Sequence, residues 1–329
     1  MKGKRVLFFA AQLFGYQDEI RSTMEKLGAV VDYFDERPAN NFFVKAMIRL
    51  NRRVISPYIN AYHRQIINDT SQFTYDYIFI IKGESISVNS IKLMRQIHPN
   101  AKIIMYQWDS VANNKNALLL MPHVDKNFSF DKIDCEKYGL TFRPLFFIDD
   151  YAKVSLERSK LRYDTLFIGT VHGDRYSIVQ QINEALHGKS YSWFYFPSRL
   201  LYYKKCLQDH TVRMAGANVF QFKPMHKEYI LQLFGQAKTV IDIQHPKQTG
   251  LTMRCIETIG AKRKLITSNI HIKEYDFYNP NNILVIDRRN PIINENFINT
   301  PYEDIPDNIY QNYSINGWLT QIFNLDTNE

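Results

Sequence analysis

The sequence contains few cysteines, and they lie far apart. Among its 329 residues only Cys135, Cys206 and Cys255 are cysteines, and no two of them form a C-x-x-C pair. This spacing excludes a disulfide framework and a conventional zinc site, and it favours a reducing compartment. No apolar stretch approaches about 18 residues, so no membrane-spanning helix is predicted. The apolar run 6–11 is too short for a signal-peptide core with its cleavage site, and it predicts a first strand instead.

Several ligand-binding motifs are also missing. The first predicted strand is followed by a single glycine, Gly15, where a dinucleotide-binding fingerprint needs three. No G-x-x-x-x-G-K-[ST] occurs, which argues against a P-loop ATPase, and no G-x-S-x-G occurs, which weakens a hydrolase interpretation. No two aspartates are separated by one residue, so the sequence lacks the D-x-D metal site of many nucleotide-sugar enzymes. We therefore expect no metal, and we expect backbone amides and basic side chains to bind any phosphate.

The composition is that of a folded, basic protein. There are 41 Lys and Arg residues against 33 Asp and Glu, which gives a formal net charge of +8. Hydrophobic residues make up 45% and charged residues 22%, which excludes wholesale disorder. At roughly 100–200 residues per domain, the length predicts two domains. The positive charge is dispersed and no RNA-binding signature is present, so we expect no nucleic-acid partner.

Short apolar runs alternate with helical stretches along most of the chain. The run 77–81 is continuously apolar, which is typical of a strand buried on both faces. Strands that alternate with helices predict βαβ units and parallel sheets. The predicted strands are 5–10, 30–34, 77–81, 101–106, 126–129, 164–168, 191–196, 239–243, 264–267 and 282–286. The predicted helices are 17–27, 42–55, 87–96, 176–186, 226–233 and 251–261.

A polar, charged stretch at residues 149–163 interrupts this alternation and marks the predicted domain boundary. We expect an α/β domain at residues 1–150, a second α/β domain at 151–305, and a helical tail at 306–329 that returns to the first domain. Two such domains would place a ligand cleft at the carboxyl ends of their strands.

The most informative segment follows the predicted strand 239–243. Its polar turn leads to a helix that we expect to open near residue 250, which would leave the amides of residues 250–252 free at the positive end of the helix dipole. Arg254 and Glu257 are i,i+3 neighbours and share a helix face. An anion at the helix start would lie near Arg254, and a nucleotide ribose would reach Glu257. The alternative is a surface ion pair on an ordinary amphipathic helix.

Three further residues are candidates for chemistry. Asp109 follows a predicted buried strand, where a carboxylate would deprotonate an acceptor hydroxyl or, alternatively, cap the next helix. Lys82 follows the strand 77–81 and would approach a substrate there, although a turn lysine without a partner is the commoner explanation. His245 lies at a strand end and would orient a phosphate or a sugar hydroxyl, although lone histidines are more often structural.

Two basic segments stand out. Residues 42–54 carry four positive charges, no acidic residue, and apolar side chains at helical spacing. A basic amphipathic helix is typical of a contact with an anionic membrane surface, so we expect a cytoplasmic protein that is peripheral at the inner face of the plasma membrane. The alternative is a core helix with a solvated basic face. Residues 199–205 form a second, basic and aromatic patch.

Three groups of segments resemble the GT-B glycosyltransferases. Residues 248–269 are similar to their nucleotide-binding segment, in which a turn precedes an R-x-x-E helix, a short basic link and a strand that ends in Thr. Residues 166–170 (Leu-Phe-Ile-Gly-Thr), followed by Arg175, resemble their F-[IV]-G-[ST] loop. Residues 106–110, 128–131 and 143–146 form the third match. The resemblance is strongest to the spore-maturation-protein-like group and to bacterial capsule, exopolysaccharide and lipopolysaccharide transferases.

This resemblance implies a GT-B fold, in which two Rossmann-like domains with parallel sheets face each other across a cleft. It implies a metal-independent glycosyltransferase that moves a sugar from a nucleotide-diphosphate donor to a lipid-linked surface-glycan acceptor, with the nucleotide sugar as substrate and no separate cofactor. Glu257 would hold the ribose, and Gln248 replaces the first Glu of the better-known E-x₇-E pattern. The expected donor-site residues are Gly169, Thr170, Arg175, Gln248, Thr249, Gly250, Leu251, Arg254 and Glu257. The expected catalytic residues are Asp109, Lys82 and His245.

Two alternatives stay open. A nucleotide-sugar 2-epimerase of the same fold would bind the same donor but would need no acceptor, and the basic segment 42–54 argues against it. A non-catalytic nucleotide-sugar-binding subunit of a glycan-assembly complex would keep Glu257 but would tolerate the loss of Asp109.

Overall fold

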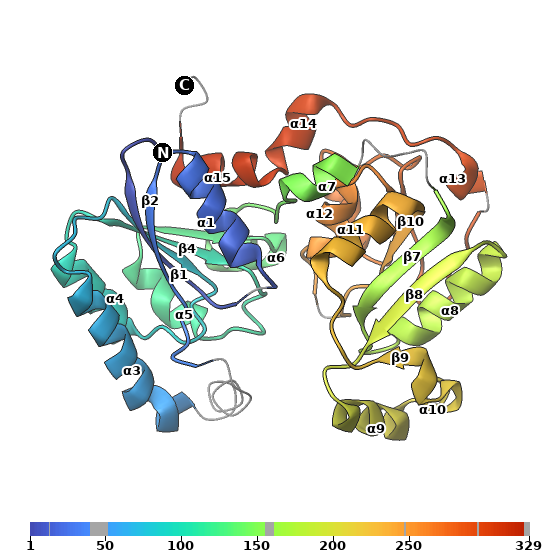
Figure 1. Cartoon of the computed structure of the whole chain (residues 1–329), viewed down its shortest axis with the longest axis horizontal. Coiled ribbons are helices and arrows are strands. Elements are labelled where there is room, and N and C mark those ends of the chain that lie inside the picture. Colours follow the sequence, from blue (N-terminus) through green and yellow to red (C-terminus); the bar gives the residue numbers. More distant parts are fainter. Residues whose placement is uncertain (13, 40–51, 155–160, 247, 295, 326–329) are drawn as a thin grey trace. The chain divides into compact units, whose positions relative to one another are not determined.

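The computed structural model describes residues 1–329 except 13, 40–51, 155–160, 247, 295 and 326–329 (Figure 1). It divides into two compact units: unit 1 is Met1–Pro144 with Ile315–Glu329, and unit 2 is Leu145–Ser314. The stretch 149–163, where we expected the boundary, lies within unit 2. Most of the predicted basic helix 42–54 lies outside the described residues. No helix of the described residues is both long enough and apolar enough to cross a membrane.

Unit 1 is built on a six-stranded parallel sheet with the strand order β2-β1-β3-β4-β5-β6. Its central strands are continuous apolar runs, so both faces are buried. The strands are β1 (Arg5–Ala10), β2 (Val30–Phe34), β3 (Tyr77–Ile81), β4 (Lys102–Gln107), β5 (Lys126–Ser129) and β6 (Thr141–Phe142). The helices are α1 (Tyr16–Lys26), α3 (Arg52–Asp69), α4 (Val88–Ile97), α5 (Ala117–Leu120), α6 (Lys132–Tyr138) and α15 (Ile315–Phe323).

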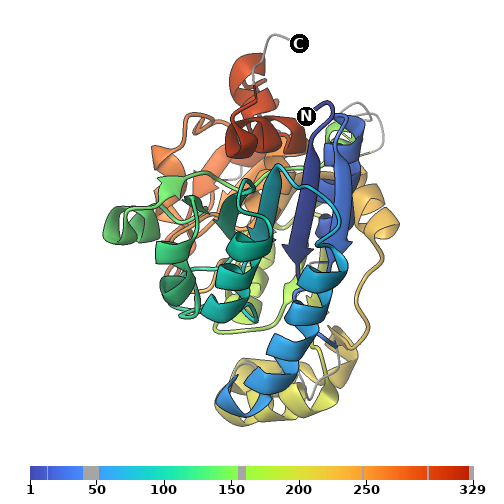
Figure 2. The same ribbon diagram turned by 90° about the vertical axis from the view of Figure 1, so that its left-hand side faces the viewer.

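The C-terminal helix α15 completes the core of unit 1 (Figure 2). Trp318 is fully buried, and its ring centroid lies 4.8 Å from that of Tyr106 and 5.9 Å from that of Phe79. Tyr106 and Phe79 belong to the central strands β4 and β3, so the last helix of the chain packs on a sheet formed almost entirely by its first half. Residues 306–314 of the expected tail lie in unit 2.

Unit 2 has a second six-stranded parallel sheet, with the order β12-β11-β10-β7-β8-β9. The strands are β7 (Tyr163–Thr170), β8 (Ser190–Tyr195), β9 (Phe220–Gln221), β10 (Ala237–Asp242), β11 (Lys264–Thr267) and β12 (Ile283–Val285). The helices are α7 (Asp149–Val154), α8 (Arg175–Leu186), α9 (Arg199–Gln208), α10 (His210–Ala215), α11 (Lys227–Gln236), α12 (Met253–Gly260), α13 (Asn296–Asn299) and α14 (Asp307–Asn312).

Each sheet has one topological switch point, where the winding of the chain reverses direction. In unit 1 it lies between β1 and β3, and in unit 2 between β7 and β10. Doubly wound sheets bind ligands in the crevice at the carboxyl ends of the strands that flank this point. The two switch points therefore locate the region of each unit in which a site is expected.

The predicted strands agree closely with the observed ones. All ten are present, and their ends differ by at most two residues. The short strands β6 and β9 were not predicted, because two-residue strands carry no periodicity. The prediction for the helix at 251–261 was wrong at its start: α12 begins at Met253, with Thr252 as its N-cap. Residues 199–205, interpreted only as a patch, belong to α9.

Candidate functional site

Arg175 ties together the two strands that flank the switch point of unit 2. Its Nε donates to the carbonyl oxygen of Ile243, just after β10, at 2.7 Å, and its Nη1 donates to that of Thr170, at the end of β7, at 2.9 Å. Gly169 leaves room for this arrangement, since a Cβ at that position would lie 3.2 Å from Nη1 of Arg175. The predicted residues Gly169, Thr170 and Arg175 therefore form one group.

Arg175 is a buried cation whose hydrogen bonds go to backbone carbonyls only. Within the described part of the chain its Nη2 makes no hydrogen bond and no carboxylate pairs with it. Burial lowers the pKa of Arg175 to about 10, and the charges of Arg288 and Arg254 lower it as well, while Asp242 opposes them. The side chain stays cationic at neutral pH. An anion beside Nη2 would offset the cost of burying this charge.

Arg288 joins the segments that follow β7, β10 and β12. Its Nε and Nη2 donate to the carboxylate of Asp174 at 2.9 and 2.7 Å, and Nη2 also donates to the carbonyl oxygen of Gln244 at 3.0 Å. The side chain of Gln244 accepts from Oγ of Ser268, just after β11, at 2.7 Å. This network fixes the carboxyl edge of the sheet around Arg175, and no sequence motif pointed to it.

His245 lies beside His172, with a distance of 5.4 Å between ring centroids. Burial lowers the pKa of His172 to about 4, and Arg175 lowers it as well, so the ring is neutral at neutral pH. Its buried Nδ1 has no hydrogen-bond partner among the described residues. His245 belongs to unit 2, whereas the other two expected catalytic residues, Asp109 and Lys82, belong to unit 1.

The amides of residues 250–252, which we expected in the first turn of the helix, precede α12, because this helix begins at Met253. Thr252 caps α12, and its Oγ1 accepts from the amide of Cys255 at 3.2 Å and donates to the carboxylate of Asp242 at 2.9 Å. Leu251 is a core residue with 2% exposure. The side chain of Gln248 donates to the carbonyl oxygen of Gly250 at 3.0 Å.

Thr249 is held to the segment after β11. The side chain of Asn269 donates to the carbonyl oxygen of Thr249 at 3.0 Å. The polar residues of this turn thus bind the turn itself. They shape the loop before α12, and the expected helix start near residue 250 is corrected to a start at Met253 with Thr252 as its cap.

Arg254 and Glu257 form the ion pair that the alternative interpretation foresaw, but the pair is mostly buried. Nη1 of Arg254 donates to Oε2 of Glu257 at 2.7 Å, and only 7% of the Glu257 side chain is exposed. Tyr151 of α7 hydrogen-bonds to both side chains, and burial together with the Glu257 charge raises the pKa of its hydroxyl. The guanidinium of Arg254 also lies over the ring of Phe234, at 5.2 Å. Glu257 is therefore already fixed in one position.

In unit 1, the structure brings Lys82 and Asp109 into contact. Nζ of Lys82 lies 2.7 Å from Oδ2 of Asp109 and 3.4 Å from Oε2 of Glu84. Burial would lower the pKa of Lys82, but the carboxylates of Asp109, Glu84 and Glu36 outweigh it and raise that pKa. Asp109 is 40% exposed and does not cap a helix, since α5 begins at Ala117. Two of the alternatives are thus wrong: Lys82 is not a turn lysine without a partner, and Asp109 is not a helix cap.

The backbone at Lys82 is in a conformation that disfavours side chains. Lys82 has φ 73° and Gly83 has φ 63°, both in the left-handed region. A non-glycine residue there costs of order 1 kcal/mol, so the surrounding structure has to hold it. The amides of Asn114 and Asn116 do so by donating to the carbonyl oxygens of Lys82 and Gly83, both at 2.6 Å. These two hydrogen bonds stabilise the strained backbone and so keep Lys82 at the switch point.

Glu36, which the sequence reasoning missed, is a fully buried carboxyl group in the same region. Neither of its carboxyl oxygens has a hydrogen-bond partner among the described residues. Burial raises its pKa to about 7, although Arg37 and Lys82 act in the opposite direction. Arg37 itself donates to Oε2 of Glu84 at 2.6 Å. The edge of unit 1 therefore gathers three acidic side chains around two basic ones.

The backbone carbonyl of Glu36 fixes the position of this acid. It accepts from Nε2 of His63 on α3 at 2.9 Å and from Oγ of Ser85, just after β3. A signal for this cluster was present in the sequence, since Asp35-Glu36-Arg37 directly follows a predicted strand. It was missed because the local sequence pattern does not predict the order of the strands. That order brings the end of β2 close to the end of β3.

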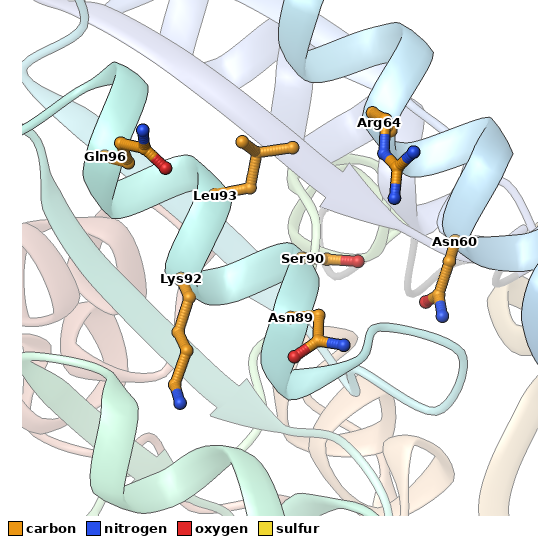
Figure 3. Close-up of a pocket in the computed structure, with 7 residues that line it drawn as sticks. All are labelled: Asn60, Arg64, Asn89, Ser90, Lys92, Leu93 and Gln96. Atoms are coloured by element: carbon orange, nitrogen blue, oxygen red, sulfur yellow. The ribbon is translucent and has the colours of Figure 1, made fainter.

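A groove between α3 and α4 lies apart from these groups (Figure 3). Its volume is about 320 Å³, and none of the predicted site residues lines it. Asn60 and Arg64 project into it from α3, and the other lining residues, Asn89, Ser90, Lys92, Leu93 and Gln96, come from α4.

No protein-family model and no curated protein matches the sequence. Solved structures do match the fold. A glycosyltransferase from Rickettsia africae has a TM-score of 0.60 at 13% identity, over 98% of this chain and 99% of that one. Anabaena HepE in complex with UDP and glucose has a TM-score of 0.59 at 11% identity, over 98% and 99%. A UDP-GlcNAc 2-epimerase from Methanocaldococcus jannaschii, in complex with UDP-GlcNAc and UDP, has a TM-score of 0.51 at 11% identity, over 99% and 100%.

At these identities the likeness shows the fold alone. The matches extend over nearly the whole length of both chains in each pair, so both units are included. The chain has the two-unit α/β architecture of GT-B proteins, with two six-stranded parallel sheets. The expected fold class is therefore confirmed.

Proposed function

We propose that the chain is a glycosyltransferase that transfers a sugar from a nucleotide-diphosphate donor to an acceptor hydroxyl. The observation that carries the proposal is Arg175, a buried cation at the switch point of unit 2 with which no carboxylate of the described residues pairs. A diphosphate is the kind of ligand that such a group stabilises. One structure of the same fold is a glycosyltransferase from Rickettsia africae, and another, Anabaena HepE, was solved with UDP and glucose.

The chemistry divides between the two units. The acceptor oxygen attacks the anomeric carbon of the donor, its proton passes to Asp109, and the nucleotide diphosphate leaves with the electron pair of the broken bond. Lys82 is a positioning residue, because its ammonium holds the carboxylate of Asp109 at 2.7 Å. Arg175 stabilises the charge that develops on the departing diphosphate, which a divalent metal does in other enzymes. Glu257 accepts hydrogen bonds from the ribose hydroxyls.

The acceptor in this proposal is a bacterial surface glycan carried on a lipid. It rests on the resemblance of residues 248–269 and 166–170 to capsule and lipopolysaccharide transferases. A protein that acts on such an acceptor works at the inner face of the plasma membrane.

Calorimetry with UDP as the probe tests the donor site. Arg175→Lys keeps the charge but loses the fork of the guanidinium, so we expect UDP to bind about 10- to 150-fold more weakly, the range of one hydrogen bond to a charged group. Arg21→Ala, which removes an exposed i,i+4 pair with Glu25, is the control and should leave the affinity unchanged. Equal affinities for wild type and Arg175→Lys would overturn the assignment.

A product assay separates the proposal from the epimerase alternative, which the fold also permits. With a nucleotide-sugar panel and a pool of lipid-linked glycans, a transferase releases nucleoside diphosphate only when the acceptor is added, and EDTA does not stop it. A 2-epimerase converts the donor into its epimer without an acceptor. Epimer formation in the absence of acceptor would show that the protein is a 2-epimerase.

A further inference from the structure

The helices α9 and α10 lie at one end of unit 2, next to β9 (Figure 1). Their outer side chains form an exposed apolar stripe. Leu200, Tyr203 and Leu207 have exposed fractions of 77%, 59% and 87%, and Met214 on α10 has 70%. The first three are spaced i, i+3 and i+7, so they lie on one face of α9. We call these four side chains and the cations around them the α9–α10 surface.

The opposite face of α9 is already anchored in the core of unit 2. The ring of Tyr202 is 6% exposed and packs against the rings of Phe196 and Phe220, at 5.5 Å from each. Val212 of α10 is fully buried. The fold therefore needs the inner face of this helix pair, whereas the outer stripe contributes nothing to the core.

Most of the basic side chains of this surface pair with no carboxylate of the described residues. Residues 199–223 contain five basic residues and a single acidic one, Asp209. Asp209 caps α10 and pairs with Lys205 at 2.9 Å. Among the described residues no carboxylate pairs with the other four basic side chains, which are Arg199, Lys204, Arg213 and Lys223.

We propose that the α9–α10 surface docks the protein on an anionic lipid bilayer. Exposed leucines, a tyrosine and a methionine flanked by unpaired cations are the composition of a helix that lies in the headgroup region, with its apolar side chains at the acyl boundary. The excess of positive charge selects anionic headgroups, and each basic side chain near such a surface raises the affinity about fivefold.

The side chains of this surface are not among the groups assigned to donor and acceptor. None of the proposed donor-site or catalytic residues falls within 199–223. Membrane binding can therefore be measured without substrate. A failure of the docking proposal leaves the proposed transferase activity untouched, and a failure of the transferase proposal leaves the docking testable.

Cosedimentation of the full chain with vesicles tests the proposal. The vesicles are phosphatidylcholine alone or with about one third phosphatidylglycerol. We expect binding only to the anionic vesicles, and we expect it to weaken as salt is raised. Lys204→Glu with Arg213→Glu should reduce the bound fraction at least tenfold, and Leu200→Ser with Leu207→Ser should do the same. All four side chains are exposed, so the variants should fold.

The control carries the same kinds of change on exposed residues of unit 1: Lys92→Glu, Lys115→Glu and Leu119→Ser. It should bind the anionic vesicles as wild type does. Tyr203→Trp adds a local probe, whose fluorescence should shift to the blue with anionic vesicles and be quenched by brominated lipid.

Three results would overturn the proposal. The first is that wild type does not cosediment with the anionic vesicles. The second is that Lys204→Glu with Arg213→Glu cosediments as wild type does, which would assign any membrane binding to another part of the chain. The third is a concentration-dependent dimer that the Leu200→Ser and Leu207→Ser changes abolish while no vesicles are bound, because the stripe would then be an interface between copies of this chain.

Discussion

The two units present charged groups at the same place in the same kind of sheet, but the groups are of opposite character. At the edge of unit 2, the unmatched buried group is a cation, Arg175, whose hydrogen bonds to the described residues go to carbonyl oxygens. At the edge of unit 1, the buried cation Lys82 is bound to Asp109, and the unmatched buried group is an acid, Glu36. At the edge of unit 2 the carboxylates of Asp174 and Asp242 bind Arg288 and Thr252, so Arg175 is the cation that suits a diphosphate. The edge of unit 1 holds more carboxylates than cations and suits hydroxyl groups and the protons they release.

The difference also teaches how similar folds acquire different sites. The switch point fixes only where the loops meet, and the residues that follow each strand decide the sign of the charge. In unit 2 the residues that follow β7 and β12 include Arg175 and Arg288, with Asp174 as the partner of Arg288. In unit 1 the residues that follow β2, β3 and β4 include three acids, which outnumber two cations: Glu36, Glu84 and Asp109 against Arg37 and Lys82.

The largest effect should come from Asp109→Asn. If the edge of unit 1 supplies the base, this change removes the proton acceptor, and turnover should fall about 10²- to 10⁴-fold. Affinity for UDP should stay within about twofold, because unit 2 binds the donor in our proposal. Asp125→Asn is the matched control, since Asp125 is a similarly exposed carboxylate of unit 1 in an ion pair with Arg95. Turnover by Asp109→Asn within a factor of a few of wild type would remove Asp109 from the chemistry.

Glu36→Gln tests whether the edge of unit 1 holds a buried acid, because this change should alter how the free energy of unfolding depends on pH. The folded-state pKa of Glu36 is raised from 4.5 to about 7, so this group destabilises the fold once it ionises. Below the unfolded-state pKa both states hold the proton and nothing is lost. Between pH 4.5 and 7 the unfolded state releases the proton first, and the free energy of unfolding falls by about 3 kcal/mol in total.

The Gln variant cannot ionise and should escape this loss. Measured by denaturant titration, its advantage over wild type should grow between pH 4.5 and 8 by about 3 kcal/mol. Glu25→Gln, on an exposed carboxylate paired with Arg21, is the control and should show no such growth. A constant difference between Glu36→Gln and wild type at all pH values would mean that Glu36 ionises as it would in water.

Much of the fold could be predicted from the sequence, and less of the site. Continuous apolar runs such as 77–81 identify buried strands without further information, because both faces must be covered. Arg175 and Glu257 were predicted as site residues from the resemblance. In the structure Arg175 donates to the carbonyl oxygen of Ile243, and Glu257 accepts from Arg254. Glu36, Arg288 and Tyr151 were missed, since each meets partners from distant segments whose proximity is set by strand order and helix packing.

The start of α12, which was predicted two residues too early, shows a second reason why the sequence was not sufficient. A polar turn with Thr249, Gly250 and Thr252 predicts a helix start nearby, but which residue becomes the cap depends on a tertiary contact. Thr252 is the cap because its hydroxyl also reaches the buried carboxylate of Asp242 at 2.9 Å. Local propensity ranks Ser, Thr and Asp as caps, but it does not choose between two candidates three residues apart.

The smallest effect should come from Glu257→Gln, which tests whether a mostly buried ion pair also binds a ligand. If Glu257 accepts hydrogen bonds from the ribose, wild type should bind UDP more tightly than 2′-deoxy-UDP by about 1 kcal/mol, and Glu257→Gln should lose most of this preference. The comparison of two ligands on one variant cancels any general damage from the weakened contact with Arg254. Arg254→Lys, which keeps the charge of the partner, is the control and should retain the preference. If both proteins discriminate equally between the two nucleotides, the pair of Arg254 and Glu257 acts in the packing of α12 against α7 through Tyr151, and the ribose is bound elsewhere.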